Sequence, residues 1–255
     1  MLFSDEVLML TERDEFYYHE MVAHVPMAYV PHARRALVLG GGDGAVVLQL
    51  LQYEELEEIV VVEWDEEIVD FMKDYMPRLG AAFSSPRVSV VNEDAVAYVA
   101  DMCTQGAPKF DIVIGDTMDG NKIKNTQSAE FYADVAKCAV ADDGIYAGNM
   151  RGASWGTRVL ADMYANVTHS FDETHLFQIF LPTSVSSHMS AVIASNAYHP
   201  FQHKLDWNAI GARNITHRYY NRDVHYSSFI LPKFIRHALG APNLSMSDAK
   251  DSFTS

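Results

Sequence analysis

Residues 36–44 read Ala-Leu-Val-Leu-Gly-Gly-Gly-Asp-Gly, an apolar run that ends in a glycine-rich turn. A helical pattern follows over Val46–Gln52, so the segment predicts a buried strand, a tight turn and a helix. Glycines let the backbone turn sharply and approach a ligand closely, and the N–H groups of the next helix face that ligand. We therefore expect Gly40, Gly42 and Asp43 at a nucleoside site. An NAD site is the alternative, but the run lacks the G-x-G-x-x-G spacing.

The next two apolar runs also end in acidic residues. Glu63 closes Glu58–Glu63 about twenty residues after the turn, where a carboxylate can accept hydrogen bonds from a ribose diol. A surface acid at the end of a strand is the simpler interpretation of Glu63 alone. Asp94, with Glu93 and Ala95, closes the following run, and its carboxylate can accept a hydrogen bond from an adenine amino group. A helix N-cap is an equal alternative for Asp94. Together the three strand ends favour an adenosyl ligand.

Short apolar runs alternate with helix-length amphipathic segments from Ala36 onward. Val/Ile/Leu runs without alternation are typical of parallel strands buried on both faces, and strand–helix alternation predicts a doubly wound sheet. We expect an α/β, Rossmann-like doubly wound sheet, mostly parallel with an antiparallel edge pair. The expected strands are Ala36–Gly41, Glu58–Glu63, Val88–Asp94, Phe110–Asp116 and Gly144–Asn149, with His175–Leu181 and Ser190–Ser195 as the edge pair. The expected helices are Val46–Gln52, Glu66–Tyr75, Asp94–Met102, Ser128–Val140, Trp155–Val167, Leu205–Ala212 and Val224–Leu239.

Two aspartates follow the fourth parallel run. Asp116 ends that strand and Asp119 comes one short turn later, so both are expected at the carboxyl edge of the sheet, where open α/β folds bind ligands. A carboxylate there can take the proton that an amine must lose to become a nucleophile, and a second can anchor a distant ammonium. A polar turn, Asp-Thr-Met-Asp-Gly, is the equal alternative.

The segment before Ala36 is too short for an independent domain. Residues 1–35 are expected to form a remnant strand (Glu6–Thr11) and a helix through Tyr18 to His24, residues 36–240 the catalytic domain, and residues 241–255 a loose tail. On that helix Tyr18, His19 and Glu20 form either a polar wall over an acceptor pocket or a surface or interface patch.

Composition narrows the class of protein. Apolar residues make up 49% of the chain, enough for a sizeable core, and the net charge of −15 argues against a nucleic-acid partner. No apolar run reaches the ~18–20 residues of a membrane span, and the N-terminus does not resemble a secretory signal. The two cysteines, Cys103 and Cys138, are in no metal-ligand spacing and are expected to be buried thiols in a reducing compartment, which is the cytoplasm.

Several segments carry a family resemblance. Leu10–Met21 (LTERDEFYYHEM), then His24-Val25-Pro26, then LVLGGGDGAVV resemble the signature region of the spermidine-synthase (polyamine aminopropyltransferase) family. Further matching segments are Glu63-Trp64-Asp65, Glu93-Asp94-Ala95, Phe110–Asp116, Glu130-Phe131-Tyr132 and Arg218–Asn221 with His225 and residues 229–234.

The resemblance implies a Rossmann-like fold of the S-adenosylmethionine-dependent methyltransferase type. It also implies a transferase of polyamine biosynthesis with decarboxylated S-adenosylmethionine as co-substrate, an amine acceptor such as putrescine or a related polyamine, and methylthioadenosine as by-product. It implies no permanently bound cofactor and no metal. The implied roles are Asp43 at the aminopropyl ammonium, Glu63 at the ribose, Asp94 at the adenine and Asp116 as general base. Tyr18, His19 and Asp119 would position the acceptor.

The departures from the family pattern fall on the acceptor side. Met9 replaces a glutamine, Ser184 replaces a pocket tyrosine, Gly120 replaces a proline, and Lys122 and Lys124 enter the loop after Asp119. The family's N-terminal β-hairpin domain is expected to be mostly missing, which leaves the assembly open, with a homodimer as the candidate. Two alternatives stay open: an S-adenosylmethionine-dependent amine N-methyltransferase and a non-catalytic nucleoside-binding relative.

Overall fold

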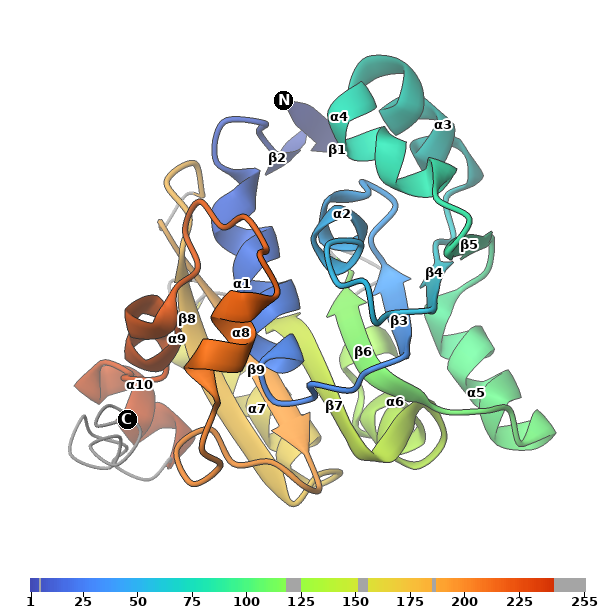
Figure 1. Ribbon diagram of the computed structural model, residues 1–255. Helices are drawn as coiled ribbons and strands as arrows, with labels where there is room; N and C mark the ends of the chain where they lie inside the picture. The colour runs from blue at the N-terminus through green and yellow to red at the C-terminus, as the bar shows by residue number, and fades with distance from the viewer. Residues whose placement is uncertain (5, 118–124, 151–155, 185–186, 241–255) are drawn as a thin grey trace.

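The computed structural model describes residues 1–4, 6–117, 125–150, 156–184 and 187–240, and its centre is a seven-stranded sheet (Figure 1). The strands lie in the order β5-β4-β3-β6-β7-β9-β8. Their bounds are β3 Arg35–Gly40, β4 Glu58–Val62, β5 Val88–Val91, β6 Phe110–Asp116, β7 Val140–Met150, β8 Glu173–Phe180 and β9 His188–Ser195.

The sheet is mostly parallel. β5, β4, β3, β6 and β7 run in one direction, while β9 is antiparallel to both β7 and β8. The order reverses between β3 and β6, which is the point where a doubly wound sheet opens to a ligand. The predicted sheet and its antiparallel edge pair are confirmed.

Both faces of the sheet are covered. In β3, β4 and β6 successive side chains enter two different cores, so Val38, Val61 and Ile114 pack on one face and their neighbours on the other. α1 (Glu15–Met27), α2 (Ala45–Leu50), α8 (Trp207–Ala212) and α9 (Arg222–Ser228) lie on the first face. α5 (Ala95–Gln105), α6 (Ala129–Asp134), the π-helical turn η3 (Val135–Ala139), α7 (Thr157–Thr168) and α10 (Lys233–Leu239) lie on the second. This double burial explains apolar runs without alternation.

Two predicted helices are interrupted. α6 stops at Asp134, the π-helical turn η3 follows it, and β7 begins at Val140, the residue at which the predicted helix ends. The single helix predicted over Val224–Leu239 is wrong: α9 ends at Ser228, and α10 starts after Pro232, which lacks the N–H that a helix interior needs. α3 (Glu66–Tyr75) matches its prediction, and α4 (Pro77–Gly80) with the 3₁₀ turns η1 (Ala81–Ser84) and η2 (Asn125–Gln127) completes the set.

The N-terminal segment is a hairpin followed by a buried helix. β1 (Leu2–Ser4) pairs antiparallel with β2 (Val7–Leu10), and β1 is a strand that the pattern did not predict. Every residue of α1 except Tyr17 is buried, and the helix packs on α2, β7 and β8. The predicted tail, residues 241–255, lies outside the described residues.

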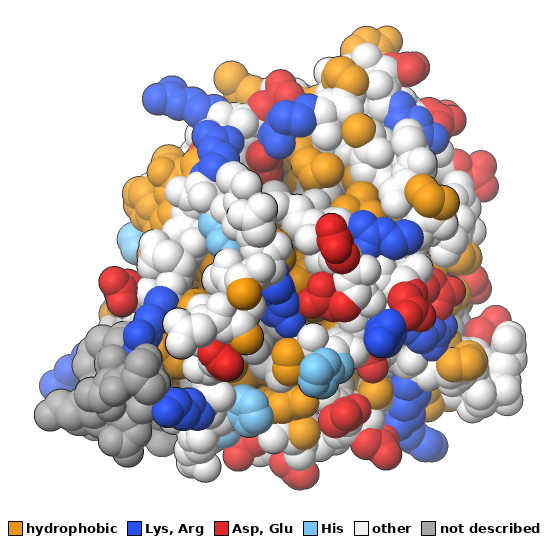
Figure 2. All heavy atoms as spheres, viewed as in Figure 1, with side chains coloured by type: hydrophobic (Ala, Val, Ile, Leu, Met, Phe, Trp, Pro, Cys, Tyr) orange, Lys and Arg blue, Asp and Glu red, His pale blue; other side chains and the backbone are white. Residues whose placement is uncertain are grey.

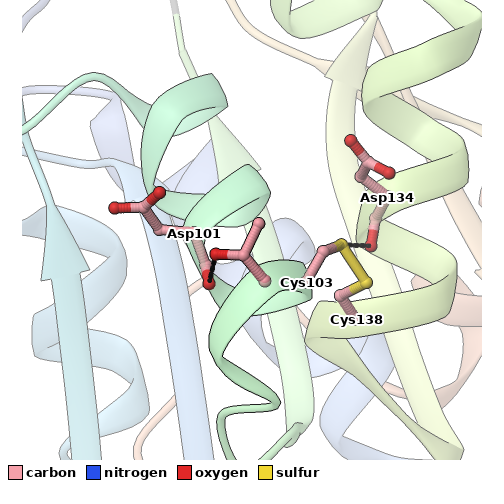
Figure 3. Close-up of a disulfide and its surroundings, with 5 residues drawn as sticks. Asp101, Cys103, Asp134 and Cys138 are labelled. Carbon is pink, nitrogen blue, oxygen red and sulfur yellow. Dashed lines mark hydrogen bonds between the residues drawn. A yellow bond between two sulfur atoms is a disulfide. The ribbon is translucent and has the colours of Figure 1, made fainter.

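The two cysteines form a disulfide, so the prediction of free thiols is wrong. Cys103 in α5 bonds Cys138 in η3, with their Cα atoms 5.1 Å apart (Figure 3). The residues are 35 positions apart in sequence, and both helices cover the same sheet face, where their side chains meet. That proximity comes from the tertiary packing and has no local sequence signal.

On the face seen in Figure 2, acidic and basic side chains are interspersed, and no broad basic surface covers it. Within the described ranges, none of the helices has the length and apolar character required to cross a membrane.

Candidate functional site

Four loops follow the carboxyl ends of β3, β4, β5 and β6, which are adjacent in the sheet. Gly40, the last residue of β3, lies directly opposite Asp116, the last residue of β6. The strand-end acids predicted from the sequence, Glu63, Asp94 and Asp116, therefore lie at one edge of the sheet. Asp94 caps α5 there.

Two glycines of the turn pack directly against the strand ends. At Gly40 φ is +84°, and a Cβ there would lie 2.4 Å from the carbonyl oxygen of Asp116. At Gly42 a Cβ would lie 2.7 Å from Glu63 Oε2, and the Gly42 N–H donates to that oxygen at 3.0 Å. A side chain at either position would push the loop off the strand ends, so the glycines bring the turn against the Asp116 backbone and the Glu63 carboxylate.

Glu63 is buried directly beneath this turn. Its carboxylate accepts the N–H groups of Gly42 and, at 3.1 Å, of Asp65. Burial raises the pKa of Glu63, against the lowering effect of these hydrogen bonds. A buried carboxylate that is fixed by two backbone groups has remaining lone pairs for a ligand hydroxyl.

Asp94 acts as a helix cap. It is exposed, and its Oδ1 accepts the N–H groups of Val96 and Ala97 at 2.9 and 3.1 Å, so the N-cap alternative is what the structure shows. Glu93 lies next to Glu63, because its N–H donates to the Glu63 carbonyl at 3.2 Å, and Ala95 is buried at the start of α5. A role of these three residues at an adenine stays a prediction.

The polar side chains at the strand ends form a cluster, here called the carboxylate cluster, which consists of Tyr18, His19, Asp43, Glu63 and Asp116. All of them are buried except Asp43, whose side chain is 21% exposed. The Tyr18 hydroxyl donates to Asp116 Oδ1 at 2.9 Å, and His19 Nε2 lies 3.6 Å from Asp43 Oδ2. One ligating atom each of His19, Asp43 and Asp116 lies within 4.8 Å of the others. α1 supplies Tyr18 and His19 from the side, and the strand ends supply the carboxylates.

Burial and neighbouring charges shift the pKa values of Asp43 and Asp116 in opposite directions. Burial, with the charge of Asp43, raises the pKa of Asp116 to about 6, although His19 and Tyr18 work against the rise. Burial also opposes ionisation of Asp43, but the imidazolium of His19 holds the pKa of Asp43 below its usual value. Burial and the charge of Asp116 keep the pKa of Tyr18 well above its usual value, so Tyr18 keeps its proton and donates a hydrogen bond to the carboxylate. The arrangement gives one permanent anion and one proton acceptor tuned near neutral pH.

Among the residues that the structure describes, two groups have side chains of the types that bind a divalent cation. The first is His19, Asp43 and Asp116, which could equally surround a cationic substrate group. The second, at the start of β8, is Glu173, His175 and His199. His199 Nδ1 accepts the N–H groups of Phe201 and Gln202, so the proton of its neutral ring sits on Nε2 and leaves that nitrogen no lone pair for a metal.

The structure describes only some of the residues predicted on the acceptor side. Ser184 lies in the turn 181–184, which Asp14 at the start of α1 ties down by accepting the N–H and hydroxyl of Thr183. Asp119, Lys122 and Lys124 lie outside the described residues.

Glu20 does not form a polar wall. It is buried and accepts the backbone N–H groups of Arg218, Tyr219 and Tyr220 at 2.8–2.9 Å, so it anchors the C-terminal segment to α1. Neither the polar wall nor a surface or interface patch describes Glu20, because its contacts are buried within the chain.

Two contacts at the site were not predicted from the sequence. Glu15 binds His19 Nδ1 at 2.9 Å, and its i,i+4 spacing in α1 was a signal that could have found it. Asn149 in β7 donates to the carbonyl of Thr117 at 3.1 Å and so holds the residue after Asp116, a contact that depends on strand order.

Residues 15–204 match the sequence profile of the spermine/spermidine synthase domain. A polyamine aminopropyltransferase of Clostridium perfringens (strain SM101 / Type A) is 33% identical over 239 residues, which cover 92% of this chain and 82% of that protein. A polyamine aminopropyltransferase of Sodalis glossinidius is 34% identical over 243 residues, with 93% and 82% covered.

Solved structures of spermidine synthases have a similar fold. The crystal structure of spermidine synthase from Thermotoga maritima matches with a TM-score of 0.86 at 29% identity, over 92% of this chain and 78% of that one. A spermidine synthase in complex with the transition state analogue AdoDATO matches with a TM-score of 0.84 at the same identity and coverage. These similarities confirm the predicted fold class and the resemblance found in the sequence.

Proposed function

This chain belongs to the spermine/spermidine synthase family and is an aminopropyltransferase, and we propose that it moves the aminopropyl group of decarboxylated S-adenosylmethionine to an amine, releasing methylthioadenosine. The observation that carries the proposal is the carboxylate cluster, in which Asp43 and Asp116 face one another and His19 at the edge of the sheet. It is a site for a cationic donor with a base beside it.

The donor's nucleoside would lie over the glycine turn. Glu63, fixed by the Gly42 N–H, would accept the hydroxyls of the ribose, and Gly40 lets the backbone lie close to the ligand. Glu93, Asp94 and Ala95 would surround the adenine at the start of α5; Oδ2 of Asp94 is not used by the helix cap.

Charge favours the decarboxylated donor. Asp43, Glu63 and Asp116 carry three negative charges against one imidazolium at His19, a net of −2. Decarboxylated S-adenosylmethionine brings a sulfonium and an ammonium, whereas intact S-adenosylmethionine adds a carboxylate that would be placed among three others. Like charges in a buried site repel strongly. We infer that Asp43 receives the aminopropyl ammonium.

Asp116 would serve as the general base. The acceptor amine enters as an ammonium and gives one proton to Asp116, and its nitrogen lone pair then forms a bond to the donor carbon beside sulfur. The carbon–sulfur bond breaks, its electron pair stays on sulfur, and neutral methylthioadenosine leaves; the proton on Asp116 passes to solvent. The Tyr18 hydroxyl, 2.9 Å from Asp116 Oδ1, holds the carboxylate in place. A base with a pKa near the working pH suits this transfer.

The acceptor would be putrescine or a related polyamine. His19 and Tyr18 would line its reactive end, and Ser184, in a turn tied to α1 through Asp14, would border its far end. Asp119 would anchor the second ammonium. Serine in place of the family's tyrosine leaves more room, so longer or modified amines belong among the candidates.

The test is a donor-by-acceptor panel. The protein is incubated with decarboxylated or intact S-adenosylmethionine and with putrescine, longer polyamines and monoamines, and the products are weighed by mass spectrometry. An aminopropyl gain together with methylthioadenosine is expected. A methyl gain from the intact donor would establish the methyltransferase alternative, and tight methylthioadenosine binding without any product would establish the non-catalytic one.

Cytoplasmic location and a homodimeric assembly remain predictions from the sequence. The Cys103–Cys138 disulfide bears on the first, because disulfides persist mainly in oxidising compartments. Counting free thiols in protein trapped with an alkylating reagent at cell lysis tests the location, and sedimentation equilibrium tests the assembly.

A further inference from the structure

Glu15 is a buried carboxylate beside the proposed reaction site that the mechanism above does not use. Its side chain is 1% exposed, and its Oε2 lies 2.9 Å from His19 Nδ1. Its other oxygen accepts Nη2 of Arg78, in α4, at 2.6 Å. An uncompensated carboxylate at this depth would be strongly unfavourable, so both partners are needed to keep Glu15 charged.

The opposite nitrogen of the His19 ring faces the strand ends. His19 Nε2 lies 3.6 Å from Asp43 Oδ2, too long for a hydrogen bond but close enough for an ion pair. Both ring nitrogens therefore face carboxylates, and only the imidazolium has a proton for each. Burial alone would lower the pKa of His19, but Asp43 and Glu15 raise it to about 10.

We propose that Glu15 is a positioning residue for the transfer reaction: held by Arg78, it fixes the orientation and the second proton of the His19 ring, and the imidazolium so formed keeps Asp43 and Asp116 ionised side by side. The inference rests on the proposed function, since it concerns the base and the donor-binding carboxylate of that site.

Asp43 and Asp116 need a positive charge beside them. Carboxylates that share a buried site do not both ionise unless a positive charge lies between them. The His19 imidazolium supplies that charge within 4.8 Å of both, and it lowers the pKa of both Asp43 and Asp116. A neutral ring would lose the ion pair with Asp43 and turn freely between its partners. Glu15 holds the ring in one orientation and, together with Asp43, keeps it charged.

The experiment follows the His19 ring by ¹⁵N NMR of histidine-labelled, ligand-free protein, with His19→Gln to identify its signals among the 11 histidines. The wild-type ring should stay doubly protonated up to at least pH 8. In Glu15→Gln the midpoint of its titration should fall by at least about one pH unit, the size of a lost neighbouring charge. In the same variant kcat should fall about tenfold, while the Kd for methylthioadenosine changes less than about twofold.

Glu55→Gln is the matched control, because Glu55 also pairs with an arginine (Arg213, 2.9 Å) but lies away from the described site residues. It should alter neither the titration nor kcat. A wild-type ring that is neutral at pH 7 overturns the proposal even where Glu15→Gln folds poorly, and so does an unchanged midpoint in Glu15→Gln. Because the titration needs no turnover, a failure of aminopropyl transfer is recognised separately.

Discussion

Replacing Asp116 by asparagine should separate catalysis from stability. The amide has nearly the same shape, and its oxygen can still accept the Tyr18 hydroxyl, so the site should keep its geometry. The variant cannot take a proton from the acceptor amine. Loss of a general base costs about 10²–10⁴-fold in rate, so kcat should fall at least ~100-fold while the Kd for methylthioadenosine stays nearly unchanged.

The same substitution should stabilise the fold. Burial and Asp43 raise the pKa of Asp116 from 3.8 to about 6, so the folded protein binds this proton more tightly than the unfolded chain does. The ionised carboxylate therefore destabilises the fold as pH rises from 3.8, fully so above about 6. At about 1.4 kcal/mol per pH unit, the effect is roughly 3 kcal/mol at pH 8. Asp116→Asn should recover up to this amount at pH 8 and nothing near pH 4.

The assay pairs steady-state kinetics with urea unfolding at pH 8 and pH 4. Tyr18→Phe is the control, because it removes the hydrogen bond but keeps the carboxylate, and it should lose less activity than Asp116→Asn without the gain at pH 8. Turnover of Asp116→Asn within tenfold of the wild type would refute the base assignment. A loss of stability at pH 8 would refute the account of a destabilised buried carboxylate.

Three further predictions concern pH and the disulfide. Turnover should rise with pH through about 6, since the base must lose its proton, and His19→Gln should move this midpoint upward because the imidazolium lowers the pKa of the base; a profile flat from pH 5 to 8 would contradict this. Burial lowers the pKa of His24 and His225 to about 3, so the stability that they contribute is full above pH ~6.5 and lost as pH falls toward 3. Urea midpoints that are equal at pH 7 and 4.5 would exclude that loss. The double variant Cys103→Ser, Cys138→Ser should be less stable by about 3–4 kcal/mol, with kcat at 25 °C unchanged, and a Tm equal to that of the oxidised protein would show that the cross-link does not stabilise the fold.

The sequence predicted the sheet because its strands carry their own signal. Val38, Val61 and Ile114 belong to continuous apolar runs, and each run needed burial on both faces, which only a covered parallel sheet provides. The positions of Glu63 and Asp116 followed, since the carboxyl ends of parallel strands meet at one edge.

What the sequence could not predict depended on contacts between distant segments. Glu20 anchors backbone almost 200 positions away, and nothing near Glu20 distinguishes that role from a place at the site. The Cys103–Cys138 bond and the Arg78–Glu15 pair likewise require the packing of separate helices. Asp94 shows a different limit, because one carboxylate at the start of a helix fits a cap and a ligand equally well.

The central claim is that three strand-end carboxylates and one imidazolium form a site for a doubly cationic nucleoside. Calorimetric titration of the wild-type protein with decarboxylated and with intact S-adenosylmethionine tests it most directly. The decarboxylated donor should bind at least about tenfold more tightly, which corresponds to about 1.4 kcal/mol of repulsion from the extra carboxylate. Equal affinity, or tighter binding of the intact compound, would contradict it.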